Sequence, residues 1–167
     1  MTTLATTGHM DLTKVSAPLV RSALDELLKR YADGELVGLS CIAEGADSLF
    51  AEALLAAGGR LIAVIPSRDY RGRQVTPSHA QAFDRFVEAA DQVLVMPYET
   101  AGRAAYEAAN AVLLDRADRL VAVWDGTPPT GKGGGTADVV VRAREVGLPV
   151  DVVWPEGAER GARGQSA

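Results

Sequence analysis

The stretch LVGLSCIAEGADSLFAEALLAAGGRLIAVIP, residues 36–66, decides the fold of this chain. It opens with a near-continuous apolar run over 36–43 and closes with a second over 61–65, each the length of a buried strand. Between them, apolar residues at helical spacing predict a helix over 47–57, which the glycine pair at 58–59 stops. Strand, helix and strand in this order are typical of a parallel pair joined by a crossover helix.

The same alternation continues on both sides of this stretch. Further strands are predicted over 4–7, 92–96, 119–124 and 150–154, and further helices over 17–31, from 76 onward, over 103–115 and over 136–146. Apolar strands alternating with helices indicate a parallel sheet with both faces covered. The sequence therefore predicts an α/β fold, a single Rossmann-like doubly wound domain with a mainly parallel sheet, over residues 1–155. The polar, glycine-containing segment 156–167 is predicted to be a disordered tail.

Composition and charge exclude several classes of protein. Of the 167 residues, 47% are hydrophobic and 23% charged, an ordinary globular balance. No apolar run approaches the roughly 20 residues that cross a bilayer, and no secretory signal is visible. The single cysteine, Cys41, excludes an internal disulfide framework and fits a cytoplasmic location. The net charge of −5 argues against nucleic acid as the main partner.

In parallel α/β sheets, ligands bind beyond the carboxyl ends of the strands, where the glycine-rich turns of this chain lie. The strongest candidate is DGTPPTGKGGGTADVV, residues 125–140. Gly133, Gly134 and Gly135 allow a ligand to approach the backbone and lead into a helix N-terminus suited to phosphate. Lys132 and Thr136 are expected to assist there. The alternative is a flexible surface loop in which Thr136 only caps the helix.

Two further turns carry candidate ligand-binding residues. After the strand at 36–43, Gly45 and Ala46 permit close approach, and Asp47 either accepts hydrogen bonds from a ribose or merely caps the next helix. After the first strand, Gly8 opens the backbone and His9 either faces the crevice or is structural.

Three further residues complete the predicted ligand site. Arg68, in an arginine-rich loop after the third strand, either binds phosphate or is simply solvated. Asn110 shares a helix face with Tyr106 and is a candidate for contact with a base or sugar. Asp125 directly follows the strand predicted over 119–124. With two histidines and one cysteine far apart in sequence, no metal site and no cofactor are predicted.

Four motifs resemble the SLOG superfamily in the order in which that superfamily carries them. They are TGHMDL (7–12), EGADSLFAEALLAAGGRLIAVIP (44–66), YEAANAVLLDRADRLVAVWDG (106–126) and GGGTADVVVRAREVGLPV (133–150). The superfamily includes the "lonely guy" phosphoribohydrolases, the DNA-processing protein A fold and nucleotide-sensing domains. The resemblance implies a nucleotide ligand and a homo-oligomer. Nucleoside deoxyribosyltransferases share the general fold.

The last motif departs from the phosphoribohydrolase pattern. Gly133, Gly135 and Thr136 match it, but the expected glutamate three residues after the threonine is Val139. The nearest acid, Asp138, lies one residue early, a rotation of about 100° on a helix. If the chain is an enzyme, Glu44 and Asp138 are the catalytic candidates, with Asp47 and Asp125 as alternatives.

Three hypotheses follow from these residues. The first is a SLOG-type sensor that binds a nucleotide or nucleotide derivative without turnover. The second is an enzyme that cleaves the N-glycosidic bond of a nucleoside monophosphate, which needs a carboxylate to stabilise an oxocarbenium-like ribose. The third is a single-stranded DNA binder, against which the net charge argues.

Overall fold

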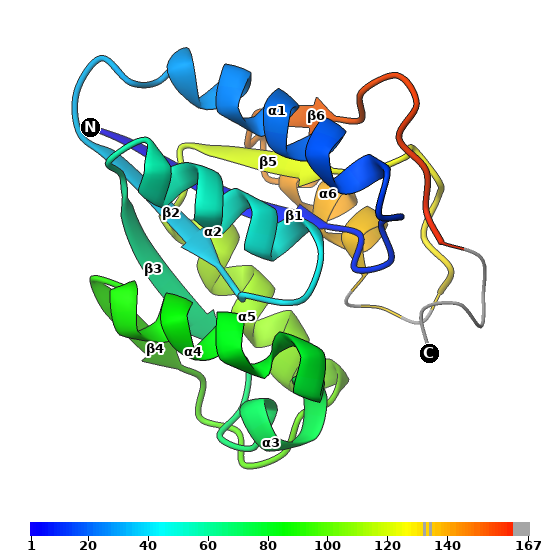
Figure 1. Cartoon of the computed structure of the whole chain (residues 1–167). Helices are drawn as coiled ribbons and strands as arrows, with labels where there is room; N and C mark the ends of the chain where they lie inside the picture. Colours follow the sequence, from blue (N-terminus) through cyan, green and yellow to red (C-terminus); the bar gives the residue numbers. More distant parts are fainter. Residues whose placement is uncertain (132, 134, 162–167) are drawn as a thin grey trace.

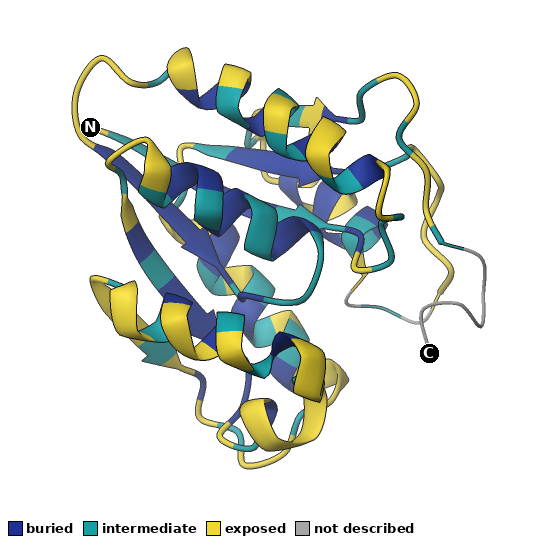
Figure 2. Ribbon diagram, in the orientation of Figure 1, coloured by how far each residue is buried: buried dark blue, intermediate teal, exposed yellow. Residues whose placement is uncertain are grey.

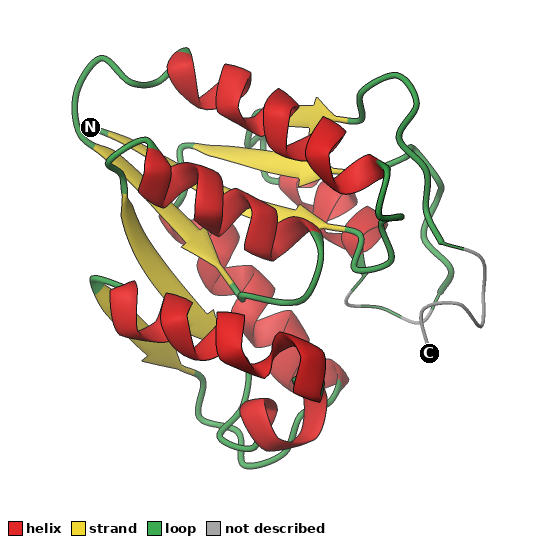
Figure 3. Cartoon of the chain, viewed as in Figure 1, coloured by secondary structure: helices red, strands yellow, loops and turns green. Residues whose placement is uncertain are grey.

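The computed structural model of the chain describes residues 1–131, 133 and 135–161. Along the sequence its elements are β1 (Thr2–Gly8), α1 (Ser16–Lys29), β2 (Leu36–Ser40), α2 (Ala46–Ala56), β3 (Arg60–Ile65), α3 (Tyr70–Gln74), α4 (Pro77–Ala89), β4 (Gln92–Val95), α5 (Arg103–Arg116), β5 (Arg119–Val123), α6 (Thr136–Glu145) and β6 (Val150–Val153). Figure 3 shows the strands between two layers of helices. Among the described helices, none is both long enough and apolar enough to span a bilayer.

The six strands form one sheet in the order β4-β3-β2-β1-β5-β6, and every neighbouring pair is parallel. Helices α1, α2 and α4 cover one face and α5 and α6 the other (Figure 1). The α/β, doubly wound prediction is therefore confirmed. The chain builds outward from β1 to β4 and then returns to place β5 on the other side of β1, so strand order reverses between β1 and β5.

Two apolar cores hold the layers together. On one face, Leu24 of α1, Phe50 of α2 and Phe83 of α4 pack under the sheet; on the other, Leu113 of α5 and Val140 of α6 do so. Figure 2 shows the strands largely buried and the outer faces of the helices exposed. The cores fix the helices against the sheet, so that the turns at its carboxyl edge start from a rigid frame.

The second strand is shorter than its sequence predicts. The apolar run continues to residue 43, but β2 ends at Ser40. The reason is Ile42, which is fully buried at φ 54°, a left-handed conformation that a β-branched residue rarely adopts. The chain leaves the sheet there and turns into α2. A short helix, α3, also forms within the segment 67–75, which the sequence predicts to be loop.

Residues 156–161, which the sequence assigns to a disordered tail, hydrogen-bond to the loop before α1. The Thr13 amide donates to the Glu159 carbonyl, and Leu12 and Arg160 form an isolated antiparallel bridge. The Ser16 hydroxyl oxygen accepts the Glu159 amide at 2.7 Å. These long-range contacts have no local sequence signal. The remaining tail residues, 162–167, lie outside the described part of the chain.

Candidate functional site

A pocket of about 540 Å³ lies at the carboxyl edge of the sheet, at the point where strand order reverses. Its walls come from the turns after β1, β2 and β5, from α3, α4 and α5, from the start of α6, and from the C-terminal segment. Of the sequence-predicted residues, the pocket brings together Gly8, His9, Glu44, Asp47, Asn110, Gly133, Gly135, Thr136 and Asp138. This is the position at which doubly wound proteins bind ligands.

Gly8 allows the close packing of three elements. A Cβ built on it would lie 2.3 Å from the Cβ of Ala46 and 2.9 Å from that of Val123, distances that real side chains do not tolerate. Ala46 is fully buried against this contact at the start of α2. The Gly8 backbone borders the pocket, but the demand for glycine arises from the packing of β1 against α2 and β5.

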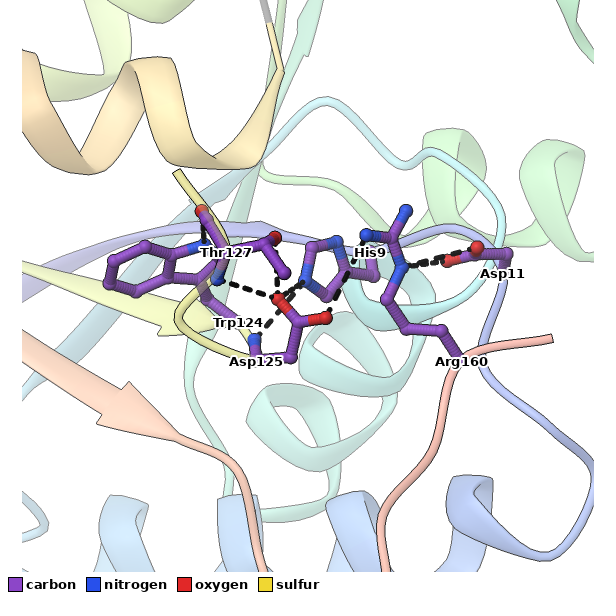
Figure 4. A network of polar contacts seen from close by, with 6 residues as sticks. All are labelled: His9, Asp11, Trp124, Asp125, Thr127 and Arg160. Carbon is purple, nitrogen blue, oxygen red and sulfur yellow. Dashed lines mark hydrogen bonds and ion pairs between the residues drawn. The ribbon is translucent and has the colours of Figure 1, made fainter. Parts of the chain in front are cut away.

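His9 belongs to a polar network that connects the turn after β1 to Arg160 in the C-terminal segment (Figure 4). Its Nε2 lies 3.1 Å from Asp125 Oδ1 and 3.2 Å from the Asp125 amide, so it donates to the first or accepts from the second according to which ring nitrogen carries the hydrogen. Arg160 continues the network: its Nε donates to Asp11 Oδ1 at 2.9 Å, and its Nη1 lies 3.8 Å from Asp125 Oδ2.

The charges in this network are held in fixed states. Burial and the nearby Arg160 guanidinium lower the pKa of His9, so the imidazole is neutral near pH 7. Burial opposes ionisation of Asp125, but the hydroxyl and amide of Thr127 both donate to its carboxylate and hold the pKa of Asp125 below its usual value. Asp125 therefore positions His9 and is not itself among the residues lining the pocket.

The turn after β2 is built around Gly45. Its φ of 85° is a backbone conformation that glycine adopts readily and other residues rarely adopt. A Cβ at this position would lie 2.8 Å from the His9 carbonyl oxygen. The Ala46 amide, the first of α2, donates to that carbonyl at 3.2 Å. Gly45 and Ala46 thus join the turns of β1 and β2, whereas Glu44 lines the pocket.

Side chains hydrogen-bond both the amide and the carbonyl of the strained residue Ile42. The Ser40 hydroxyl oxygen accepts the Ile42 amide at 3.0 Å, and His79 Nε2 of α4 donates to the Ile42 carbonyl at 3.0 Å. The Ser48 hydroxyl donates to the next carbonyl, that of Ala43, at 2.8 Å. Backbone strain that its surroundings enforce in this way is concentrated at functional sites, and the residues on either side of Ile42, Cys41 and Ala43, line the pocket.

Asp47 lies in the pocket floor, in the first turn of α2, with 7% of its surface exposed. Its Oδ2 accepts the Ala43 amide at 3.2 Å. Burial raises the pKa of Asp47 to about 7, although the Ala43 hydrogen bond favours the ionised form. Next to it, burial and the Asp47 carboxylate raise the pKa of the Cys41 thiol well above its ordinary value, so this thiol is protonated.

Two tyrosines complete the floor beside Asp47. Tyr70 of α3 and Tyr106 of α5 meet edge to face, with ring centroids 6.4 Å apart. Burial raises the pKa of both hydroxyls, so both rings are neutral. Asn110 follows one turn after Tyr106 on α5, as its predicted helix face requires.

At the α6 end of the pocket, the chain already provides an anion. Asp138 turns back and accepts the Gly135 amide with Oδ2 at 3.1 Å, which is half of a capping box. Gly133, at φ 75°, is covered by the guanidinium of Arg103, since a Cβ there would lie 2.6 Å from Arg103 Nε. Lys132 and Gly134, two predicted phosphate contacts, lie outside the described residues.

Arg68 lies apart from the pocket. Its guanidinium pairs with Glu99, both side chains are largely exposed, and neither lines the pocket. In contrast, Arg160 is the only arginine or lysine among the described lining residues, and the acids Asp11, Glu44, Asp47 and Asp138 share the wall with it. Within the described chain, no three histidine, cysteine, aspartate or glutamate side chains gather closely enough to hold a metal ion.

Sequence reasoning missed several lining residues. Arg160 and Asp11 are hydrogen-bonded although they are 149 positions apart in the sequence, and no local sequence pattern predicts such a contact. Tyr70 lies in a segment predicted to be loop. His79 has a visible signal, a histidine in the first turn after Thr76-Pro77, but its role in holding Ile42 depends on tertiary structure.

Sheet order, helix layers and a crevice at the strand reversal define a Rossmann-like α/β protein, and solved structures share this fold. DNA processing protein A from Streptococcus pneumoniae matches with a TM-score of 0.68 and 21% identity, over 94% of this chain and 52% of that chain. The chain thus spans about half the length of that protein. No protein-family model matches the chain, and no curated protein matches it.

Two other solved structures carry the same fold. DNA processing protein A from Helicobacter pylori, described with single-stranded DNA, matches with a TM-score of 0.63 and 19% identity, over 98% of this chain and 70% of that one. The molybdenum cofactor carrier protein from Chlamydomonas reinhardtii matches with a TM-score of 0.55 and 18% identity, over 90% of this chain and 75% of that one.

Proposed function

We propose that this chain binds a nucleotide or nucleotide derivative in the pocket at the carboxyl edge of the sheet. The observation that carries the proposal is the pocket itself: about 540 Å³, at the strand reversal, bordered by residues from the turn into α2 and the start of α6. That volume suits a mononucleotide-sized ligand. Helix N-termini favour phosphate, and the aromatic floor at Tyr70 and Tyr106 favours a flat base.

The matched structures support a ligand of this kind. One of them carries the molybdenum cofactor and another binds single-stranded DNA. Single-stranded DNA is the less favoured ligand for this chain, because the net charge is −5 and acids outnumber Arg160 on the described pocket wall. A small ligand with one phosphate places far less negative charge there than an oligonucleotide does.

Isothermal titration calorimetry against nucleoside monophosphates, ADP-ribose, NAD and cyclic nucleotides tests the proposal. We expect at least one to bind, and Gly135→Glu to abolish binding, because a second carboxylate then stands at the start of α6. Gly102→Glu is the matched control: Gly102 precedes α5 as Gly135 precedes α6, but it does not line the pocket. Binding that survives Gly135→Glu, or no binding by wild type, would sink the proposal.

A second candidate function is cleavage of the N-glycosidic bond of a nucleoside monophosphate. The observation that favours it is Asp47, whose carboxyl faces the pocket with a pKa of about 7 and so holds a proton that a leaving base needs. Water would add its hydroxyl to the ribose as the base departs with that proton, and the other proton of the water would return to the Asp47 carboxylate. Chromatography for free base after incubation with AMP tests it: we expect release from wild type and none from Asp47→Asn.

Self-association and a cytoplasmic location stay predictions. A groove of about 900 Å³ between α5 and α6, with Arg103, Glu107, Leu114 and Arg142 among its lining residues, is a surface where a second copy could be sought. Light scattering during size-exclusion chromatography measures the oligomeric state directly.

A further inference from the structure

Asp47 presents one carboxyl oxygen to the pocket. Its Oδ2 is occupied by the Ala43 amide, and within the described part of the chain Oδ1 has no hydrogen-bond partner. Among the same residues, every fully enclosed side-chain polar atom has a partner. Oδ1 is therefore not fully enclosed, and since Asp47 lines the pocket, this oxygen opens into it.

The surroundings of Asp47 suit the base of a nucleotide better than its phosphate. Cys41, Tyr70 and Tyr106 offer neutral, largely apolar surfaces beside it. Arg160, the one arginine or lysine among the described lining residues, is already paired with Asp11. The start of α6 is a helix N-terminus that favours phosphate, whereas at the start of α2 the first amide is already bonded to the His9 carbonyl.

We propose, resting on the nucleotide-binding function above, that Asp47 selects the base by donating a hydrogen bond from Oδ1 to an acceptor ring nitrogen on the Watson–Crick edge of the base. Since Oδ2 already accepts an amide hydrogen, the carboxyl proton belongs on Oδ1, where it points at the ligand. Adenine and cytosine have an acceptor nitrogen on the Watson–Crick edge, whereas hypoxanthine, guanine and uracil carry a hydrogen there. The pocket therefore takes AMP in preference to IMP.

This assignment makes base choice depend on pH. The carboxyl of Asp47 donates only while it is protonated, and burial sets its pKa at about 7. The other titratable groups that line the pocket are Cys41 after β2, Glu44 in the same turn, Tyr70 of α3, His79 of α4, Tyr106 of α5, and His9, Asp11, Asp138 and Arg160. Of these, the neutral thiol and phenols do not change charge below about pH 8.

Calorimetric titration of AMP and IMP between about pH 6 and pH 8.5 tests the assignment, with the whole chain as wild type, Asp47→Asn and Glu52→Gln. In Asp47→Asn, the new amide side chain would keep the Ala43 contact through its carbonyl and present a permanent N–H donor, so the fold is preserved. Glu52 lies on the same helix, pairs with Arg21 at the surface and does not line the pocket, which makes it the acid-to-amide control.

For wild type and Glu52→Gln we expect AMP affinity to fall by up to tenfold for each pH unit above about 7, and IMP to bind more weakly than AMP. Asp47→Asn should bind AMP with the low-pH affinity throughout this range. Phosphate and His9 titrate equally in all three proteins, so the difference between variants isolates Asp47.

Equal pH profiles for wild type and Asp47→Asn, or a preference for IMP below pH 7, would overturn the role of Asp47 while leaving nucleotide binding intact. If wild type binds neither AMP nor IMP but binds other nucleotides, Asp47 is not a base-selecting residue of this kind. If it binds no nucleotide, the proposed function fails, and this inference fails with it.

Discussion

The carboxylate of Asp138 accepts the amide of Gly135 at 3.1 Å, so the start of α6 faces an anion that belongs to the chain itself. An incoming phosphate would compete with this carboxylate for the same amide, and like charges there repel. The geometry of the phosphate end of the pocket therefore depends on the position of one side chain.

Replacement of Asp138 should separate its two effects. Asp138→Ala removes the capping bond, and we expect a loss of about 1 kcal/mol in the free energy of unfolding. It also removes the resident anion, so AMP should bind more tightly while adenosine changes little. Urea unfolding and calorimetry measure the two effects.

Glu145→Ala is the control for this prediction, since Glu145 ends the same helix in a surface pair with Arg142 and does not line the pocket. AMP binding that weakens in Asp138→Ala would show that this carboxylate supports the ligand rather than competing with it.

Gly8→Ala should destabilise the fold. The new methyl group would lie 2.3 Å from the Ala46 Cβ, and α2 or β5 must move to admit it. Overpacking of this kind costs about 1–3 kcal/mol. Gly72→Ala is the control, because no atom lies within 4 Å of a Cβ built there and its φ is not positive. Thermal denaturation of both variants measures the effect, and equal melting temperatures would contradict it.

The stability of the chain should depend on pH through Asp47. A pKa raised to about 7 by burial means that the folded state binds this proton more tightly than the unfolded state does. The contribution is complete below the unfolded pKa of about 4 and is lost as pH rises to about 7, at most roughly 4 kcal/mol in all.

Asp47→Asn cannot titrate, so its free energy of unfolding minus that of wild type should grow between about pH 4 and pH 7. Urea unfolding at several pH values measures this difference. His9 acts in the opposite sense, because its lowered pKa removes stability as pH falls below about 6.5, but it is common to both proteins. A difference independent of pH would mean that Asp47 is ionised in the folded state.

Arg160→Ala should loosen the segment 156–161 without unfolding the domain. The side chain is partly exposed, so we expect at most about 1 kcal/mol in global stability. The local effect should be larger: the amides of Thr13 and Glu159, bonded across the two segments, should exchange hydrogen faster. Hydrogen exchange followed by mass spectrometry detects this, with Arg142→Ala as a surface control. Unchanged exchange would show that backbone contacts alone hold the segment.

The fold could be predicted from sequence because its signals are local. Apolar runs such as 61–65, and helix stops such as the glycines at 58–59, report directly on elements that the structure contains. The end of β2 could not be predicted, since Ile42 is typical of a strand, and its left-handed backbone is held by hydrogen bonds that include a tertiary one from His79.

The candidate site, too, could be predicted only in part from the sequence. The turns at the carboxyl edge, including those with Gly135 and Asp47, could be predicted from the position of each strand. The structure brings these two residues to one pocket. The structural role of an individual residue could not be predicted from the sequence. Gly8 is required by its contact with Ala46, and Arg68 meets Glu99 rather than the pocket, because both outcomes depend on which segments become neighbours.

The bridge between Arg160 and Asp11 also orders events during synthesis. One wall of the pocket is supplied by a residue 149 positions after the turn it contacts. The sheet from β1 to β6 can assemble on the ribosome once residue 153 has emerged, but the pocket remains open on that side until Arg160 follows. A nascent chain stalled between these two points would carry a formed sheet with an unfinished binding site.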